Sequence, residues 1–498
     1  MTAPKSRPRA RKTVVAKTPE QRGWELGPIP DDIFGSADDP PEPKSRRAPH
    51  LNIPARLRAV THNPDIYRAA AAVFIKPEGP TPGRPQKYQP HIYLIYDCAI
   101  SIFGTATATE SNLAAPEFWN IVREGIRSVL GDEEADALLD RGPTRGNWSY
   151  FFAKYLKPNL AALRETSRDL WLQQALESGL LEMDEGTWIR PACGQTVHGD
   201  ATVAHPASGQ TERQTPDRLT GRMKNRRVDP DATYATEGGG NVVYGNKYLS
   251  LAVRAADTPH SRVVLDLETL RFKKESEDPD KESEGNAVVA GMLRIRKHIS
   301  GLLAFTYDKA LHGVHRAPLI AAGITVYTPQ VENLQPQPLQ TVTHEHCCHE
   351  LYAAAGRVCE RLVPADGSRI IYNPLPATAF HPRPGGRYRF YHQIKVPCRY
   401  GPHFVLIRVD ETAQDRQIMS NGRKRFNRTH HLRMVYPGTP AGARLAGFRQ
   451  DSESKHSTWD QSYRHKHVPA YGADGGLALY FGYAWLSNSI ARAYAGKV

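Results

Sequence analysis

The chain has 498 residues, more than a single hydrophobic core usually organises, so one small module is excluded and several domains are expected. Lysine and arginine number 65 against 52 acidic residues, and the net charge of +13 favours a polyanionic partner. Hydrophobic residues make up 40% of the sequence, which excludes a wholly disordered chain.

No charge-free stretch reaches the roughly 18 residues that a membrane-spanning helix needs; the nearest is 475–491. The basic N-terminus has no apolar segment behind it, which argues against secretion. We therefore expect a cytoplasmic, nucleoid-associated protein without membrane contact. Six cysteines in so long a chain do not form a disulfide scaffold, and Cys98 and Cys193 are expected to be packing residues.

The N-terminal part divides into two regions. Residues 1–50 are rich in Pro, Arg, Lys and Asp and poor in large apolar side chains, which predicts a disordered arm. Residues 51–180 contain helically spaced apolar positions, which predict a helical DNA-binding region, with helical packing alone as the alternative. Its segment GPTPGRPQKY is typical of an A·T minor-groove contact through Arg84 and Lys87, or else of a linker.

Residues 190–329 predict the first part of an α/β core. Strands are expected at 196–203, 246–256 and 261–270, then a helix at 286–300, the strand GLLAFTYD, a helix at 315–322 and the strand ITVYTP. Three strands, helix, strand, helix, strand is the order of an RNase H-like mixed sheet flanked by helices. The sequence further predicts a β-rich insertion domain at 330–440 and C-terminal core helices at 441–498.

Three acids are candidates for a metal site in this core. Asp200 lies on the first strand, Asp308 ends the fourth, and Glu453 follows the insertion. Cutting a phosphodiester requires an activated water and a stabilised leaving oxygen, which two Mg²⁺ ions held by carboxylates provide. Taken singly, Asp200 fits a strand-edge residue bonded to turn amides, and Asp308 fits a helix cap. Asp266 and Glu268 on the third strand are alternative acids.

The motifs HGDATV, VYGNKYLSLAVRA, FTYDKALHGVH, and RQDSES followed by GLALYFGYAWLSNSIARAYA occur in this order. Together they resemble the DDE transposases of bacterial insertion sequences, in particular the IS4-like group and its actinobacterial relatives. The resemblance covers roughly 195–329 and 445–495. It implies that Asp200, Asp308 and Glu453 are catalytic and hold Mg²⁺ or Mn²⁺.

The region around Glu453 departs in part from the IS4-like signature. Arg449 precedes Glu453 by four residues, as in the family, so both would lie on one helix face and Arg449 could clamp a phosphate. Ala446 stands where the family has Tyr, and Asp460 where it has a downstream Lys. Asp451 is therefore the nearest rival of Glu453.

The resemblance implies a DNA transposase, an endonuclease that cuts double-stranded DNA at transposon ends and joins the ends to target DNA. A homodimer on DNA is expected because two ends must be paired. The alternatives are a domesticated, non-cutting DNA-binding protein of the same fold and a stand-alone RNase H-like nuclease or resolvase.

Basic residues of the core and the insertion are candidates for DNA-backbone contacts. Lys247 lies on the second strand, and the run NGRKRFNR occupies 421–428, where a solvated hairpin tip is the alternative. With those named above, the DNA-binding candidates are Arg84, Lys87, Lys247, Arg423, Lys424, Arg425, Arg428 and Arg449.

Soft ligands are concentrated in the insertion. The string HEHCCHE at 344–350, with the later Cys398 and His403, offers enough Cys and His side chains for a tetrahedral Zn²⁺. The best set is Cys347, His349, Cys398 and His403, which would form a structural site. The spacing fits no standard zinc finger, so free thiols with surface histidines are the alternative.

Overall fold

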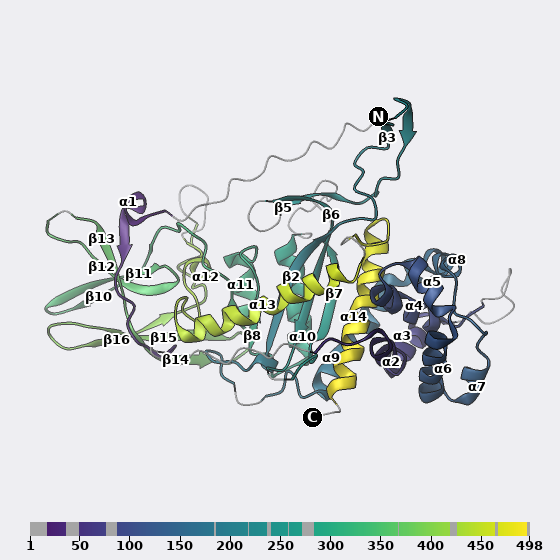
Figure 1. The fold of residues 1–498 in the computed structure, drawn as a ribbon. Helices are drawn as coiled ribbons and strands as arrows, with labels where there is room; N and C mark the ends of the chain where they lie inside the picture. The colour runs from purple at the N-terminus through teal and green to yellow at the C-terminus, as the bar shows by residue number, and fades with distance from the viewer. Residues whose placement is uncertain are drawn as a thin grey trace.

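The structure is a computed structural model that describes residues 17–35, 49–75, 87–183, 186–217, 219–236, 241–256, 258–270, 283–366, 368–418, 426–463 and 467–495. Its mixed α/β class agrees with the prediction. A helical unit, a six-stranded mixed sheet and a β-rich part follow one another across the molecule, and the long helices α13 and α14 connect them (Figure 1).

The helical unit is built around α4, which is almost completely buried because apolar side chains occupy all of its faces. The C-terminal helix α14 (Ala473–Ala495) packs along α4 so closely that a side chain at Gly482 would meet the backbone of Asp97. The helices of this unit are α2 (Ile53–Thr61), α3 (Pro64–Val73), α4 (Pro90–Phe103), α5 (Ala106–Leu113), α6 (Pro116–Leu130), α7 (Asp132–Asp136), α8 (Arg145–Phe151) and α9 (Leu160–Glu177).

Within the described ranges, no single helix combines the length and apolar character needed to cross a bilayer. Helices α4 and α5 reach that threshold only as a pair, and the pair is bent by 109°.

The central sheet has the order β5-β6-β2-β8-β9, and β7 pairs with the other half of β6. Strand β6 runs antiparallel to both β2 and β7, whereas β8 and β9 run parallel to β2. The bounds are β2 (Thr196–Ala204), β5 (Thr233–Thr236), β6 (Val242–Val253), β7 (Val263–Leu270), β8 (Ala304–Thr306) and β9 (Thr325–Tyr327).

Helices cover both faces of this sheet. Alternate residues of β6 face opposite ways, so Leu249 packs in one core with Val288 of α10 (Glu284–His298), while Tyr248 packs with Trp459 of α13 (Pro440–Gln461). Helix α11 (Gly313–Ala321) lies on the α10 side, and α13 crosses the opposite face (Figure 1). The short elements near the sheet are the hairpin β3 (Gln214–Pro216) and β4 (Met223–Asn225), and the single turns η1 (Phe152–Leu156), η2 (Lys157–Asn159) and η3 (Cys193–Gln195).

Between β9 and α13 the chain forms most of two further sheets, β1-β13-β12-β11-β10 and β14-β15-β16; strand β1 (Trp24–Leu26) joins the first of them from the N-terminal part of the chain. Their shared core also contains Leu445 and Phe448 from the first turns of α13, so this helix ties the β-rich part to the central sheet. The elements are β10 (Gln337–His344), β11 (Cys347–Ala354), β12 (Arg357–Leu362), β13 (Ile370–Pro374), β14 (Ala377–Arg383), β15 (Arg389–Val396), β16 (His403–Arg408) and α12 (Arg428–His431).

The prediction of a disordered arm over 1–50 is wrong for residues 17–35. This segment forms α1 (Pro19–Arg22) and β1 (Trp24–Leu26), and β1 pairs in parallel with β13. Trp24 packs edge-on against Tyr372, and Phe34 is completely buried. A three-residue strand gains its order from pairing with a strand more than 300 residues away, which local composition cannot reveal. Residues 1–16 and 36–48 lie outside the described residues.

Candidate functional site

The structure brings Asp200 and Asp308 together at the centre of the main sheet. Strands β2 and β8 are parallel neighbours in which His198 pairs with Thr306. Asp308 follows the last residue of β8 by two positions, and continuation of this register would set it opposite Asp200. The negative charge of Asp200 acts on Asp308, in agreement with this proximity.

The surroundings of Asp308 destabilise its ionised form. Burial raises its pKa to about 6, and the nearby negative charges of Glu284 and Asp200 act in the same direction. The backbone N–H of Ala310, which donates to Asp308 Oδ1 at 2.8 Å, and the charge of Lys247 offset this only in part. Negative potential is thus concentrated at the end of β8, where a cation would relieve it.

Asp200 is held in its ionised form. Burial alone would raise its pKa, but the interaction with His456 and the charge of Lys455 hold that pKa below its ordinary value. Burial also lowers the pKa of His456, so this ring acts as a neutral partner and not as a cation. His456 Nδ1 lies 3.4 Å from Asp200 Oδ2, and the backbone N–H of Ala201 donates to Asp200 Oδ1 at 2.9 Å. Two carboxylates of similar burial are therefore tuned in opposite directions.

A buried polar network orients His456. Ser250 pairs across the strands with Asp200, and its Oγ lies 3.1 Å from His456 Nε2. Ser250 also accepts hydrogen bonds from Lys455 and from Tyr480, so its own proton is directed to His456 Nε2, and the protonated Nδ1 of the ring then faces Asp200. Burial lowers the pKa of Lys455 to about 7.

This order of contacts, Ser250 to His456 to Asp200, resembles that of a nucleophilic triad, but Ser250 is completely buried. A substrate carbonyl or phosphate could not approach its Oγ without unfolding of the surrounding helices. The network therefore positions Asp200 and does not supply a nucleophile.

Glu453 is not in contact with the two aspartates. Its side chain is 54% exposed on α13, and its Oε1 accepts a hydrogen bond from Arg449 at 2.7 Å. The buried face of that helix presents Lys455 and His456 to the sheet instead. Its rival Asp451 is bonded to Arg254 at 2.7 Å on another side of the helix. Asp266 and Glu268 are ion-paired with Arg164 of α9.

Glu284 is a site residue that the sequence analysis missed. It is the first residue of α10; its Oε1 accepts a hydrogen bond from Tyr307 at 2.7 Å and its Oε2 lies 2.5 Å from Lys247 Nζ. Ser283 caps the helix by accepting from the N–H of Asn286. That Ser-x-x-Asn cap is the one sequence signal that could have placed Glu284 in the first turn, next to the sheet.

Among the predicted DNA contacts, the prediction that Arg428 lies on the surface is wrong. It is buried, and its guanidinium forms two hydrogen bonds to Asp415, at 2.7 and 3.1 Å. Lys247 is occupied by Glu284, while Lys87 is exposed. Arg84, Arg423, Lys424 and Arg425 lie outside the described residues.

The four predicted soft ligands are brought together. Cys347, His349, Cys398 and His403 each offer one ligand atom, and these four atoms all lie within 4.8 Å of one another. Among the described residues, this is the group whose Cys, His and acidic side chains are close enough to share one metal ion.

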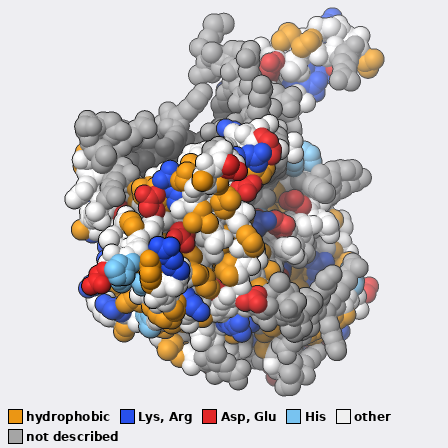
Figure 2. Space-filling view, turned by 90° about the vertical axis from the view of Figure 1, so that its left-hand side faces the viewer, with side chains coloured by type: hydrophobic (Ala, Val, Ile, Leu, Met, Phe, Trp, Pro, Cys, Tyr) orange, Lys and Arg blue, Asp and Glu red, His pale blue; other side chains and the backbone are white. Residues whose placement is uncertain are grey.

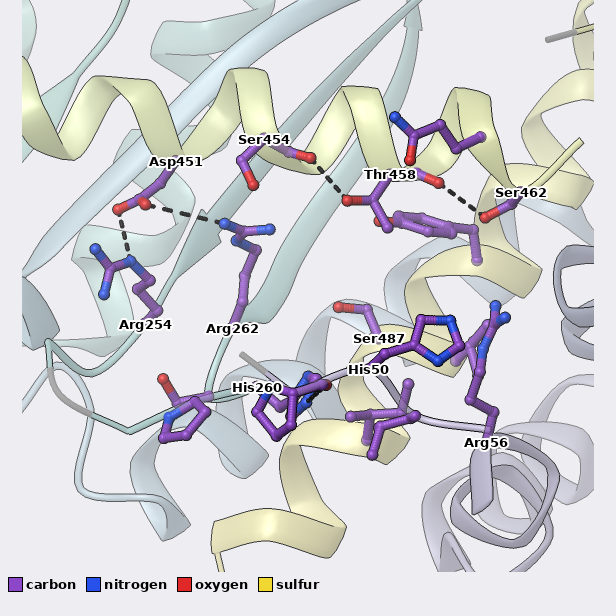
Figure 3. Close-up of a pocket in the computed structure, with 18 of the residues that line it drawn as sticks. His50, Arg56, Arg254, His260, Arg262, Asp451, Ser454, Thr458, Ser462 and Ser487 are labelled. Carbon is purple, nitrogen blue, oxygen red and sulfur yellow. Dashed lines mark hydrogen bonds and ion pairs between the residues drawn. The ribbon is translucent and has the colours of Figure 1, made fainter. Parts of the chain in front are cut away.

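A cavity of about 1050 Å³ lies between α13, α14, the β6–β7 connection and the start of α2 (Figure 3). Arg56, Arg254 and Arg262 line it, and Asp451, the one acid among its described lining residues, is bonded to Arg254 and lies 3.9 Å from Arg262. The excess of arginine suits an anion such as a phosphate. Neither Asp200 nor Asp308 lines this cavity.

No protein-family model matches the chain, and the search of curated proteins found no similar sequence.

Proposed function

We propose that the chain is a DDE-type transposase that cuts DNA at transposon ends and joins the ends to target DNA, with Asp200 and Asp308 as its metal-binding acids. The observation that carries the proposal is the electrostatic coupling of Asp200, on β2, with Asp308, just beyond the neighbouring strand β8; burial and nearby acids raise the pKa of Asp308. Two aspartates more than 100 positions apart in the sequence thereby influence each other electrostatically.

The sheet order supports an RNase H-like core. Apart from the four-residue β5, which pairs with the start of β6, the strands of this sheet in chain order are β2, β6, β7, β8 and β9, and these five lie in the order third, second, first, fourth, fifth. The second strand runs antiparallel to both of its neighbours, and the other four strands all run in the same direction, as expected for that fold. The β-rich segment between β9 and α13 stands where the insertion is expected.

The carboxylates fit a hard divalent cation. Asp200 and Asp308 offer oxygen ligands, and the raised pKa of Asp308 marks an anion without sufficient positive charge nearby. Bound Mg²⁺ or Mn²⁺ would activate water and stabilise the leaving oxygen of the phosphodiester. His456 and Ser250 keep Asp200 oriented and ionised for this role, and the basic cavity in Figure 3 offers a separate contact for the DNA backbone.

Glu453 is the proposed third acid. Its bond to Arg449 is an exposed pair spaced i,i+4, and such pairs contribute only about 0.3–0.5 kcal/mol. A DNA phosphate could therefore take Arg449 and release Glu453. Glu284, in contrast, is held by Lys247 and Tyr307 in a partly buried setting.

A comparison of E453Q with E284Q tests this assignment. We expect E453Q to lower Mg²⁺-dependent cleavage by more than about 100-fold, because loss of an outer-sphere partner of a metal already costs about 10–100-fold. E284Q should change cleavage much less, since it removes only a charge next to Asp308. Initial cleavage rates at saturating metal give the result, and the reverse order of the two variants would transfer the role to Glu284.

The second candidate is a non-cutting DNA-binding protein of the same fold. One observation favours it: Glu284 and Glu453 are already compensated by Lys247 and Arg449 inside the chain. Incubation of the protein with a duplex that carries the sequences flanking its gene, with Mg²⁺ or Mn²⁺, separates the candidates. Cleavage by the unchanged protein and its loss in Asp200→Ala support the transposase; binding without cleavage supports the rival.

Strand-transfer products separate transposition from a stand-alone nuclease, which releases cut ends without joining them. A homodimer on paired ends belongs to the same proposal, and the mass of the protein–DNA complex tests it.

A further inference from the structure

The β-rich part carries a second chemical centre, on sheets that contain neither Asp200 nor Asp308. Cys347 and His349 are alternate residues of β11 and so share one face, while Cys398 follows β15 and His403 begins β16. Cys347 Sγ lies 3.2 Å from His403 Nε2. Strand β11 belongs to the five-stranded sheet, and β15 and β16 belong to the three-stranded sheet, so the cluster spans the two sheets.

The spread of the ligand atoms suits a tetrahedral ion. With Zn–N and Zn–S distances of about 2.1 and 2.3 Å, the ligand atoms of a zinc site are about 3.4–3.8 Å apart. The four atoms here lie within 4.8 Å of one another, so small side-chain rotations suffice to enclose the ion. A complete set of two thiols and two imidazoles leaves no open position, which is typical of structural rather than catalytic zinc.

The surroundings of His349 are those of a metal ligand. The side chain is only 9% exposed, and its Nδ1 lies 2.6 Å from Glu360 Oε1. Its other nitrogen, Nε2, is buried without a hydrogen-bond partner. Metal-bound histidines characteristically direct one ring nitrogen to a carboxylate and the other to the ion. The unpartnered nitrogen is therefore explained by an ion at the centre of the cluster.

Cys398 is prepared in a similar way. The backbone N–H of Tyr400 points at its sulfur from 3.5 Å. A donor in that position stabilises a thiolate, which is the form that binds metal. Neither Cys347 nor Cys398 forms a disulfide, so both sulfur atoms are available to bind a metal.

We infer that Cys347, His349, Cys398 and His403 bind one structural Zn²⁺ that fastens the β10–β11 hairpin to the β15–β16 hairpin. Soft thiolate and imidazole ligands select zinc over the hard Mg²⁺ of the proposed catalytic site. The site lies at the end of the molecule that Figure 2 faces, where histidine side chains gather among charged ones. This inference is independent of the proposed catalytic function.

Metal analysis of the full-length, untagged protein tests the inference. We expect one zinc per chain after purification in the presence of ZnSO₄ and extensive dialysis. Cys347→Ser and Cys398→Ser should lose that zinc, whereas Cys348→Ser, a change at the exposed neighbour on β11, should keep it. Absence of stoichiometric zinc from the unchanged protein, or equal zinc loss in Cys348→Ser, would overturn the assignment.

Cobalt substitution keeps the test valid if the serine variants fail to fold. Removal of the metal from the unchanged protein by a chelator should lower its melting temperature by at least about 3 °C, and added Zn²⁺ should restore it. Co²⁺ in its place should give the intense visible bands of a tetrahedral site with thiolate charge transfer. A melting temperature that the chelator leaves unchanged, together with octahedral Co²⁺ bands, would contradict the proposal.

Discussion

Asp308→Asn is expected to abolish metal-dependent DNA cleavage and at the same time to stabilise the fold at neutral pH. The change keeps an oxygen that can accept from the N–H of Ala310 but removes a negative charge that Glu284 and Asp200 repel. If Asp308 binds the metal directly, as proposed, its loss should lower cleavage by more than about 100-fold, since outer-sphere losses already cost about 10–100-fold. A variant that is more stable and inactive is typical of a site where function is kept at the expense of stability.

The sign of the stability change follows from proton linkage. The carboxyl pKa is about 6 in the folded chain against 3.8 as the ordinary value, so the folded state binds more protons between these pH values. The free energy of unfolding therefore falls as pH rises from about 4 to 6, by up to about 3 kcal/mol at 1.36 kcal/mol for each pKa unit. Asp308→Asn should remove this fall and be the more stable protein at pH 7.5.

Urea unfolding at pH 4.5, 6 and 7.5 measures both proteins, with Asp140→Asn as an exposed aspartate control. Mg²⁺ or Mn²⁺ should raise the melting temperature of the unchanged protein and not that of Asp308→Asn. If Asp308→Asn is destabilised at pH 7.5 and still cuts DNA, Asp308 is an ordinary turn residue and the proposed site fails.

Asp415→Ala is expected to destabilise the chain by about 3–5 kcal/mol, the usual cost of removing one partner of a buried ion pair. Arg428 is only 6% exposed and depends on Asp415 for two of its hydrogen bonds. Its third bond, from Nη1 to the carbonyl of Arg408 at 3.2 Å, cannot neutralise a buried cation. Without Asp415, the guanidinium of Arg428 would remain a buried charge without a counter-ion, unless the α12 segment moves to expose it to water.

The double variant Asp415→Leu with Arg428→Leu should recover much of this loss, because apolar side chains of similar volume often replace a buried ion pair without cost. Equilibrium denaturation of the single and double variants gives the coupling energy. The same proteins test Arg428 as a DNA contact: loss of a phosphate contact would reduce the salt dependence of DNA binding, while a structural residue leaves that slope unchanged in the folded double variant. A single variant as stable as the unchanged protein would show that the pair is not buried in solution.

Sequence periodicity was sufficient for the strand and helix order around Asp200 and Asp308, because each element there buries a regular apolar pattern. The β2 segment alternates polar and apolar residues in sequence, although both of its faces are largely buried, and the short apolar run GLLAFTYD contains the buried strand β8. The position of Asp200 within the first strand and of Asp308 at the end of the fourth followed from that order. Their electrostatic coupling did not, since it depends on the parallel register of β2 and β8.

The Cys and His cluster was also predictable, and its four members are confirmed as a group that could hold a metal. Soft side chains are rare enough that a short string rich in them, followed by Cys398 and His403, left few combinations. Glu284 was missed because nothing local distinguishes one glutamate at a helix start from another. Arg428 was misread because an arginine in a basic run looks exposed until a distant acid, Asp415, is found beside it.

The sequence by itself determined the order of the core elements, the basic character of the chain, the two central aspartates as candidates and the identity of the soft ligand set. Only the tertiary structure decided which polar side chains face one another: Glu284 beside Asp308, His456 beside Asp200 and Arg449 beside Glu453. It also decided that β1 pairs with a strand more than 300 residues away. The physical reason is range. Backbone periodicity and capping act within a few residues, whereas burial and Coulomb interactions depend on distances that the folded chain alone sets.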